Sequence, residues 1–414
     1  MARRSSLQSR LAEVPIRRHK PDYWLLILIA TLLSVGLIVI YAIGPALSIY
    51  NNVGQNYYIN RQLVAVVLGI IAFVVVANVP ISVWRRAYKP LLVIAAGATL
   101  LALIMPANPQ YPAHRWIRLG SLSFQSVELL KFALLVWFAG FLVKRLKRRE
   151  ITKLRPTLVP LVGALLVIVV VVAGIQSDLG SMGVIVVMMA TMAFVAGMPF
   201  KRVLVVGCVI AAGLVLAIAT TPYRLQRLEV YLHPTSNCVS TGYQACQALI
   251  AVGSGGVVGL GLGRSVQAYG YLPEAANDSI FAIYAEKFGF IGSTILLVIF
   301  LALFARMKRI VEHVPDDFSR LLVIGVITWF SVQTLINVGA MIGLLPLKGI
   351  TLPFISYGGT SVVFVMAAMG VVFQISRYTL NQPTTLNTGG KQYEDRLSGR
   401  RLRGAYNPTA SSCS

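Results

Sequence analysis

The chain has 414 residues, of which 57% are hydrophobic and only 12% are charged, and its mean hydropathy is +0.74. Soluble domains carry about 25% charged residues, and disordered chains have low hydrophobicity, so this composition excludes both classes for most of the chain. The formal net charge is +23, but the basic residues occupy short segments between apolar runs rather than one soluble domain, which argues against nucleic-acid binding.

The polar, basic segment 1–22 is read as a cytoplasmic tail. It is not a cleavable signal peptide, because the apolar run after it is too long and has no clear cleavage site. Ten apolar runs follow, each close to the ~20 residues that cross a bilayer as a helix. Their approximate ranges are 24–43, 62–79, 89–105, 125–143, 157–174, 181–198, 202–221, 280–305, 320–343 and 356–376. The sequence therefore predicts an all-α polytopic membrane domain over residues 23–376, with ten transmembrane helices.

Lysine and arginine indicate the orientation of this domain. Cytoplasmic loops carry an excess of these residues. With the N-terminus inside, 28 of the 37 basic residues fall in the two tails and in loops on the same side of the membrane. Both termini are therefore predicted to be cytoplasmic. The basic tail 377–414 is expected to be disordered.

One predicted outer loop, 222–279 between the seventh and eighth helices, is much longer than the others. Long loops are usually functional. Its glycine-rich stretch, 253–263, lacks the ending of a phosphate loop, so close packing of backbone is the plainer interpretation. Its apolar part near 249–262 is expected to be a re-entrant or interfacial segment. Cys238 and Cys246 share this loop, and a disulfide between them is expected in an oxidising compartment.

Few acidic residues lie within the spans or on the outer side, where a carboxylate is costly and tends to be paired or functional. Asp278 stands where the long loop meets the eighth predicted helix. It is either a helix-start residue, as Asp often is, or a general base at the lipid–water boundary. Glu274, four residues earlier, is either an exposed loop charge or part of the same site.

Two further positions allow a structural or a functional interpretation. Glu128 and Lys131 are three residues apart on the fourth predicted helix, so they share a face as an ion pair or as site residues. Asp178 follows Gln176 and Ser177 at a short outer turn, where it has either turn chemistry or a site role.

Several arginines lie outside, against the usual bias toward the cytoplasm. Arginine binds phosphate and carboxylate groups with two parallel hydrogen bonds. These residues therefore fit either an anionic ligand, such as a diphosphate, or lipid headgroups. They are Arg115, Arg118, Arg224, Arg227 and Arg264.

Longer motifs resemble the SEDS (shape, elongation, division and sporulation) family. The most specific is Asn337-Val-Gly-Ala-Met-Ile-Gly-Leu-Leu-Pro346, followed by Lys348-Gly-Ile-Thr-Leu-Pro-Phe-Ile-Ser-Tyr-Gly-Gly-Thr-Ser361. Other similar pieces are Arg61-Gln62, Trp116-Ile-Arg-Leu-Gly120, Gly242-Tyr-Gln244 with Gln247, Gly253-Ser-Gly-Gly256, Tyr271-Leu-Pro-Glu-Ala275 with Asp278, Ile280-Phe-Ala282, Glu286 and Gly289-Phe-Ile-Gly292. The resemblance spans nearly the whole chain apart from the tails. It departs from the family pattern at Ser126 and Ser177, which stand where the family has proline, and at Lys287, which replaces an acid.

The resemblance implies a ten-helix peptidoglycan glycosyltransferase of the bacterial cytoplasmic (inner) membrane. Such an enzyme polymerises lipid II, an undecaprenyl-diphosphate-linked disaccharide-peptide, on the outer face. It implies Asp278 as the catalytic carboxylate. The candidate substrate-binding residues are Arg118, Glu128, Lys131, Asp178, Arg224, Arg227, Gln247, Ser254, Glu274, Lys348 and Ser356. A class B penicillin-binding protein (a transpeptidase) is the implied partner, and the motif around Lys348 and Gly349 is closer to the FtsW branch, with divisome partners and a septal role, than to the RodA branch.

The expected reaction is an inverting glycosyl transfer. A sugar hydroxyl is a poor nucleophile and needs a base, which Asp278 would supply. The departing diphosphate needs cations, from the outer arginines and Lys131 or Lys348, or from a divalent metal such as Mg²⁺ or Mn²⁺. The alternatives are a lipid II flippase, a RodA-type elongation polymerase, and a scaffold that only recruits a transpeptidase.

Overall fold

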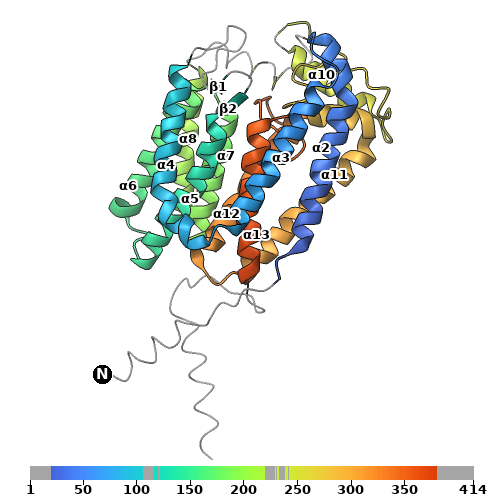
Figure 1. Ribbon diagram of the computed structural model, residues 1–414. Helices are drawn as coiled ribbons and strands as arrows, with labels where there is room; N and C mark the ends of the chain where they lie inside the picture. Colours follow the sequence, from blue (N-terminus) through green and yellow to red (C-terminus); the bar gives the residue numbers. More distant parts are fainter. Residues whose placement is uncertain are drawn as a thin grey trace, which may run out of the picture.

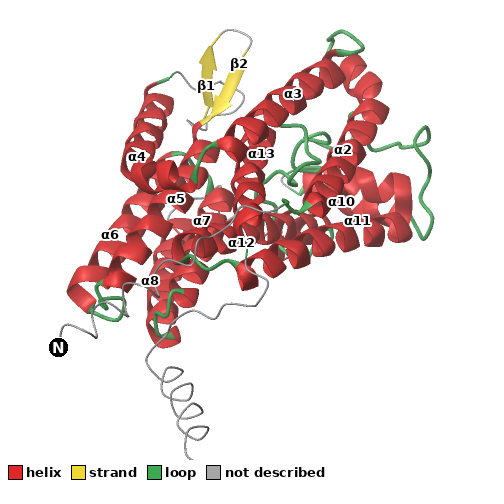
Figure 2. Ribbon diagram, turned by 60° about the horizontal axis from the view of Figure 1, so that its bottom comes forward, coloured by secondary structure: helices red, strands yellow, loops and turns green. Residues whose placement is uncertain are grey.

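The computed structural model describes residues 20–105, 116–119, 122–219, 229, 231–232, 238–240 and 242–379. This part of the chain is almost entirely helical, with one two-stranded hairpin (Figures 1 and 2). The elements are α2 (Tyr23–Tyr50), α3 (Tyr57–Asn78), α4 (Ile81–Ile104), β1 (Trp116–Leu119), β2 (Leu122–Gln125), α5 (Ser126–Lys147), η1 (Leu154–Leu158), α6 (Val159–Ile168), η2 (Val169–Ile175), α7 (Leu179–Val195), α8 (Phe200–Ala219), α10 (Tyr243–Ser254), α11 (Ile280–His313), α12 (Asp317–Met341), α13 (Gly359–Ile375) and η3 (Ser376–Tyr378). The basic tail 377–414 lies outside the described residues from 380 onward, as do Arg115, Arg224 and Arg227.

Eight helical segments of the described chain are long and apolar enough to cross a membrane. In this set η1, α6 and η2 form one segment, Leu154–Ile175. The apolar helix α7 has 17 residues and is shorter than the rest, and α8 has 20. A helix occupies each of the ten predicted apolar runs, and the number of ten crossings stays a prediction.

The helices form two groups with α12 and α13 between them (Figures 1 and 2). One group holds α4 to α8, and the other holds α2, α3, α10 and α11. Helix α12 packs against α5 and α7 of the first group and against α11 of the second, and α13 packs against α3 and α5. Within the apolar windows, 83% of the segment Gly359–Tyr378, 72% of α5 and 67% of α12 is buried, against 17% of α4. These three segments therefore form the core, and α4 lies at the periphery.

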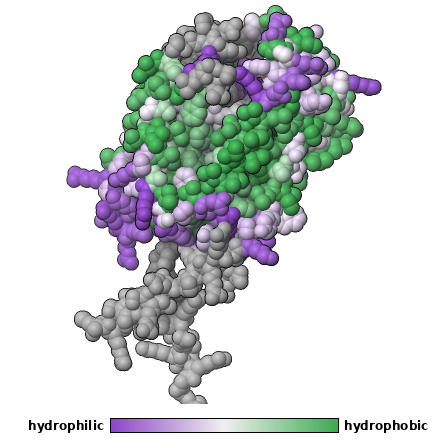
Figure 3. All heavy atoms as spheres, in the orientation of Figure 1, coloured by the Kyte–Doolittle hydropathy of each residue, from purple (hydrophilic) through white to green (hydrophobic). Residues whose placement is uncertain are grey.

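Apolar side chains form a broad band across the face of the molecule shown in Figure 3, with hydrophilic residues above and below it. Large apolar residues on the outside of α3 and α4 are exposed, for example Val74 and Val93. Exposed apolar residues in this number are suited to lipid contact. The fold is that of a multi-pass membrane protein, as the composition predicts.

The hairpin of β1 and β2 was not predicted. The antiparallel strands pair Trp116 with Gln125, and Thr360 of α13 holds the hairpin by donating to the Ser123 carbonyl at 3.2 Å and accepting from the Gln125 N–H at 3.2 Å. Strands of four residues are too short for a reliable alternation signal in the sequence.

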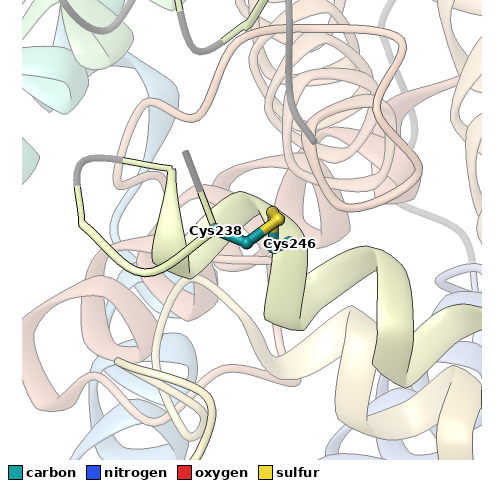
Figure 4. The surroundings of a disulfide bond; sticks show 2 residues. All are labelled: Cys238 and Cys246. Carbon is teal, nitrogen blue, oxygen red and sulfur yellow. A yellow bond between two sulfur atoms is a disulfide. The ribbon is translucent and has the colours of Figure 1, made fainter. Parts of the chain in front are cut away.

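The segment near 249–262 is helical only in its first part, and its re-entrant or interfacial character stays a prediction. Helix α10 runs from Tyr243 to Ser254, and turns follow it. Gly256 has a φ of +51°, a conformation that ends helices and that glycine adopts without a steric cost. A disulfide joins Cys238 to Cys246 of α10, with 5.5 Å between their Cα atoms (Figure 4).

Candidate active site

Asp278 lies in the turn that leads into α11 and is half-buried. The helix begins at Ile280, and its N-cap is Ser279. The structure therefore places Asp278 one residue before the N-cap of α11.

Hydrogen-bond donors from distant parts of the chain bind the main-chain carbonyls of this turn and hold it in place. The Tyr357 N–H donates to the Ala276 carbonyl at 2.8 Å, the Ser356 hydroxyl donates to the Asn277 carbonyl at 2.6 Å, and the Asn337 side-chain amide donates to the Asp278 carbonyl at 2.7 Å. Ser356 is buried and also accepts from the Leu352 N–H at 2.7 Å. The predicted site residue Ser356 thus supports the backbone of the turn.

The segment 348–350 runs beside the Asp278 carboxylate. Gly349 has a φ of +60°, and a Cβ atom at this position would lie 3.4 Å from Asp278 Oδ2. Lys348, predicted as a site residue, precedes Gly349 and is half-buried. On its other side the segment contacts α7, because a Cβ atom on Gly180 would lie 2.9 Å from the Lys348 carbonyl. One segment therefore links the Asp278 turn with the start of α7.

Glu128 and Lys131 form a buried ion pair on α5. Their charged atoms are 2.8 Å apart, and the side chains are only 4% and 1% exposed. Lys131 also donates to Gln333 of α12 at 3.1 Å, and Gln333 donates to the Thr351 carbonyl at 2.8 Å. The ion-pair interpretation is therefore the one that the structure favours, and the pair is connected to the segment beside Asp278.

Asp178 is the buried N-cap of α7, where its Oδ1 accepts from the Ser181 N–H at 2.9 Å. This favours the turn interpretation. Ser177 has a φ of +55°, which a proline cannot adopt. Gln176 donates to the hydroxyl of Ser126 at 3.1 Å. Ser126 therefore binds the side chain of the residue that precedes Ser177, and the backbone at Ser177 has a conformation that proline cannot adopt.

The chain was compared with known proteins. The family model for cell cycle proteins of the FtsW/RodA/SpoVE type matches residues 23–381. This chain belongs to that family. It is 36% identical to stage V sporulation protein E of Bacillus subtilis over 364 residues, which cover 88% of this chain and 99% of the relative. It is 35% identical to the probable peptidoglycan glycosyltransferase FtsW of Saccharophagus degradans, over 86% of this chain and 92% of that protein.

Solved structures show the same fold for this FtsW/RodA/SpoVE member. A chain from a structure of a peptidoglycan synthase complex, described as coordinating polymerization and crosslinking, superposes with a TM-score of 0.70 at 25% identity, over 86% of this chain and 98% of the other. The rod shape determining protein RodA of Thermus thermophilus superposes with a TM-score of 0.63 at 23% identity, over 87% and 98%. The family predicted from the motifs is confirmed.

In this FtsW/RodA/SpoVE chain the remaining predicted site residues lie on β1, on α10 and in the turn before α11. Arg118 is on β1 with an exposed side chain. Gln247 is half-buried on α10, and Ser254 is exposed at the end of that helix, where its hydroxyl donates to the Ala251 carbonyl at 2.9 Å. Glu274 has a φ of +51° and accepts from the Asn277 side chain and main chain. Glu274 therefore shapes the Asp278 turn.

The glycine-rich stretch packs against an interruption of α11 at Gly289, where φ is 64° and ψ is −163°. The Phe290 N–H on the far side of the break donates to the Gly256 carbonyl at 2.9 Å, and the Leu260 N–H donates to the Glu286 carbonyl at 2.9 Å. A Cβ atom on Gly259 would clash with the Lys287 carbonyl. Backbone groups exposed in a membrane helix need such partners, so close packing explains these glycines.

Sequence reasoning missed the role of the first two turns of α11. The Glu286 carboxylate is fully buried and accepts from the Ser265 hydroxyl at 2.5 Å and from the N–H groups of Val266 and Gln267 at 2.8 and 3.1 Å. Lys287, the departure from the family pattern, donates to the Leu262 carbonyl at 2.7 Å. These contacts anchor the outer segment 260–267 to the helix that follows Asp278.

Tyr357 lies near the turn on the side of α3. Its ring packs edge-on against Tyr58 with 5.4 Å between ring centroids. The Arg61 guanidinium lies near the Tyr357 hydroxyl.

The predicted divalent metal has no ready-made ligand set in the described part of the chain. No group of three or more His, Cys, Asp or Glu residues there could hold a metal ion. The described residues alone thus do not form a metal site closed by protein ligands.

Proposed function

We propose that this chain is a peptidoglycan glycosyltransferase that polymerises lipid II at the outer face of the cytoplasmic membrane. Relatives that match nearly their whole length carry the name probable peptidoglycan glycosyltransferase FtsW. The observation that carries the proposal is Asp278, a half-buried carboxylate on a turn whose backbone is fixed by three neighbouring residues. A fixed base is what activation of a sugar hydroxyl requires.

The reaction follows from this base. The acceptor hydroxyl gives its proton to the Asp278 carboxylate while its oxygen forms a bond to the anomeric carbon of the donor. The bond from that carbon to the diphosphate breaks with inversion, and undecaprenyl diphosphate leaves with the electron pair. The transition state resembles an oxocarbenium ion, as in other glycosyl transfers.

The leaving diphosphate needs positive charge. Lys348 suits this role, since its segment borders the Asp278 carboxylate. Lys131 does not, because it is buried in an ion pair with Glu128 and also binds Gln333. Arg118 is exposed on β1 and remains a candidate, whereas Arg224 and Arg227 lie outside the described residues.

The test is lipid II polymerisation by the purified chain in nanodiscs, with Asp278→Asn as the decisive variant. Loss of a general base lowers rates by about 10²–10⁴-fold, so we expect no glycan strands from this variant. The matched control is Glu312→Gln, which removes a carboxylate from a partly exposed pair with Lys308 and should polymerise normally. Polymerisation by Asp278→Asn at the wild-type rate would refute the assignment of Asp278 as the catalytic base. Lipid II translocation in liposomes without polymer would favour a flippase, and normal division in cells that carry Asp278→Asn would favour a scaffold.

We propose further that the enzyme acts in septal synthesis with a class B penicillin-binding protein and divisome proteins. The curated relatives named FtsW and a structural neighbour taken from a peptidoglycan synthase complex support this. Rescue of cells depleted of FtsW, but not of cells depleted of RodA, is the expected outcome. Rescue of RodA depletion alone would assign the elongation role instead. Polymerisation with and without the cognate transpeptidase tests whether the partner is required.

A further inference from the structure

The Asp278 peptide lies outside the regular hydrogen bonding of α11. The hydrogen bonding of the helix begins at the Ser279 carbonyl, which accepts from the N–H groups of Ala282 and Ile283 at 3.1 and 3.5 Å. The carbonyls of Ala276, Asn277 and Asp278 therefore have no place in the helix, and each accepts from a residue distant in the sequence. The direction of the Asp278 side chain depends on these peptide planes, so whatever holds the carbonyls also aims the carboxylate.

Among these donors, Asn337 binds both the Asp278 peptide and the segment 348–350 that lies beside the Asp278 carboxylate. It is 2% exposed, and its amide nitrogen donates to the Asp278 carbonyl at 2.7 Å and to the Ile350 carbonyl at 2.7 Å. Ile350 follows Gly349, which borders Asp278 Oδ2. A single side chain thus ties the peptide that carries the carboxylate to the segment that the carboxylate faces.

Gln333 extends this arrangement one helical turn away. Residues four apart lie on the same face of a helix, and Gln333 donates to the Thr351 carbonyl just as Asn337 donates to that of Ile350. The Gln333 carbonyl oxygen accepts from Lys131 and from the Trp329 indole at 3.1 and 2.8 Å. One face of α12 therefore connects the buried ion pair of α5, the segment 348–351 and the Asp278 turn.

We propose that Asn337 is a positioning residue of this glycosyltransferase. It holds the Asp278 carboxylate at a fixed place relative to Lys348 and Gly349, so that the carboxylate meets the acceptor hydroxyl without rearrangement. A misplacement of about 1 Å at a reacting group can cost about 10²-fold in rate. The assignment rests on the proposed function, and a residue that only filled space or satisfied carbonyls would stabilise the fold without affecting the chemical step selectively.

The substitution Asn337→Asp tests this, since it keeps the shape and replaces the donating group with an oxygen that faces two carbonyl oxygens. In nanodiscs with labelled lipid II, we expect kcat to fall at least about 10-fold while KM stays within about threefold. The pH midpoint of the acidic limb of kcat should also move, because the carboxylate has a new environment. Asn78→Asp is the matched control, because Asn78 also donates its amide to a carbonyl, that of Val74 at 2.8 Å, on an exposed part of α3.

A second, milder variant keeps the test decisive if Asn337→Asp does not fold. Asn337→Ser is uncharged and has a single hydroxyl hydrogen, so it cannot donate to the Asp278 and Ile350 carbonyls together, and we expect it to lower kcat with little change in KM. The positioning role would be overturned if the variants that fold kept the wild-type kcat and pH midpoint while Asp278→Asn was inactive. The proposed function would still stand in that case. Wild-type activity of Asp278→Asn would instead overturn the function itself.

Discussion

Glu128 and Lys131 show how a buried charge depends on its partner. Removal of one member of a buried ion pair leaves the other charge uncompensated, which costs about 3–5 kcal/mol. Lys131→Met and Glu128→Gln alone should each destabilise the protein by this amount. The double variant should lose clearly less than the sum of the two. Unfolding in mixed detergent measures the cycle, and strict additivity would contradict an energetic coupling between the two residues.

Asp316, on the predicted cytoplasmic side, gives the stability of the protein a dependence on pH. Burial by itself would raise the pKa of this carboxyl, but the Ser319 N–H and hydroxyl and the Arg85 guanidinium outweigh burial and hold the pKa below its usual value. A carboxyl whose pKa is lower in the folded state stabilises the fold above its unfolded pKa of about 3.9. That stabilisation is lost as the pH falls through the folded-state pKa.

The pH effect can be separated from the capping of α12, because Asp316 is also the N-cap of that helix. Asp316→Asn keeps a good capping side chain, so it should lose only the stabilisation that comes from the charged carboxylate. The variant should therefore be less stable than the wild type at pH 7, and the difference should shrink as the pH falls below about 5. Asp316→Ala should lose a further 0.5–2 kcal/mol or so at every pH. Melting temperatures from pH 7 to pH 3 measure both effects. An identical pH profile for Asp316→Asn and wild type would show that the carboxylate is not involved.

At the scale of elements, the break in α11 depends on the glycine-rich stretch. Gly259 has a φ of +91°, and a Cβ atom there would meet the Lys287 carbonyl. The left-handed backbone alone costs other residues about 1–2 kcal/mol, and the clash adds to that. We therefore expect Gly259→Ala to lower the melting temperature and to reduce polymerisation, because the Asp278 turn leads into this part of α11.

The comparison for this prediction is Gly263→Ala in the same stretch. A Cβ atom on Gly263 would meet nothing within 4 Å, so this variant should melt and polymerise like the wild type. Equal melting temperatures for the two alanine variants would show that backbone packing at Gly259 does not support the helix break.

For the whole molecule, the orientation in the membrane is the main prediction. Gln55 precedes α3 on the predicted outer side, whereas Thr152 and Lys201 lie in predicted cytoplasmic loops, and all three side chains are exposed. In a background that carries both Cys208→Ser and Cys413→Ser, an impermeant maleimide should label Gln55→Cys in intact cells and label Thr152→Cys and Lys201→Cys only after lysis. Labelling of Lys201→Cys in intact cells would refute the predicted ten crossings, since this position reports on the number of crossings before α8.

The class of the molecule and its family follow from the amino-acid sequence alone. Apolar runs of about 20 residues can be satisfied only as membrane helices, because lipid offers the backbone no hydrogen-bond partners. The motifs around Asn337 and Lys348 were specific enough to identify the family, and the spacing of Glu128 and Lys131 already placed both on one helical face. These features are local, so they can be recognised along the chain.

The surroundings of Asp278, in contrast, are known only from the folded structure. The residues that hold its turn, Asn337 and Ser356, lie 59 and 78 positions further along the chain than Asp278 itself, and no local pattern predicts which carbonyl a buried amide will bind. The same holds for the break at Gly289, which needs the glycine-rich stretch as a partner, and for the short hairpin β1–β2, which Thr360 secures. Contacts of this kind depend on how helices pack at a distance, and the order of residues alone does not specify them.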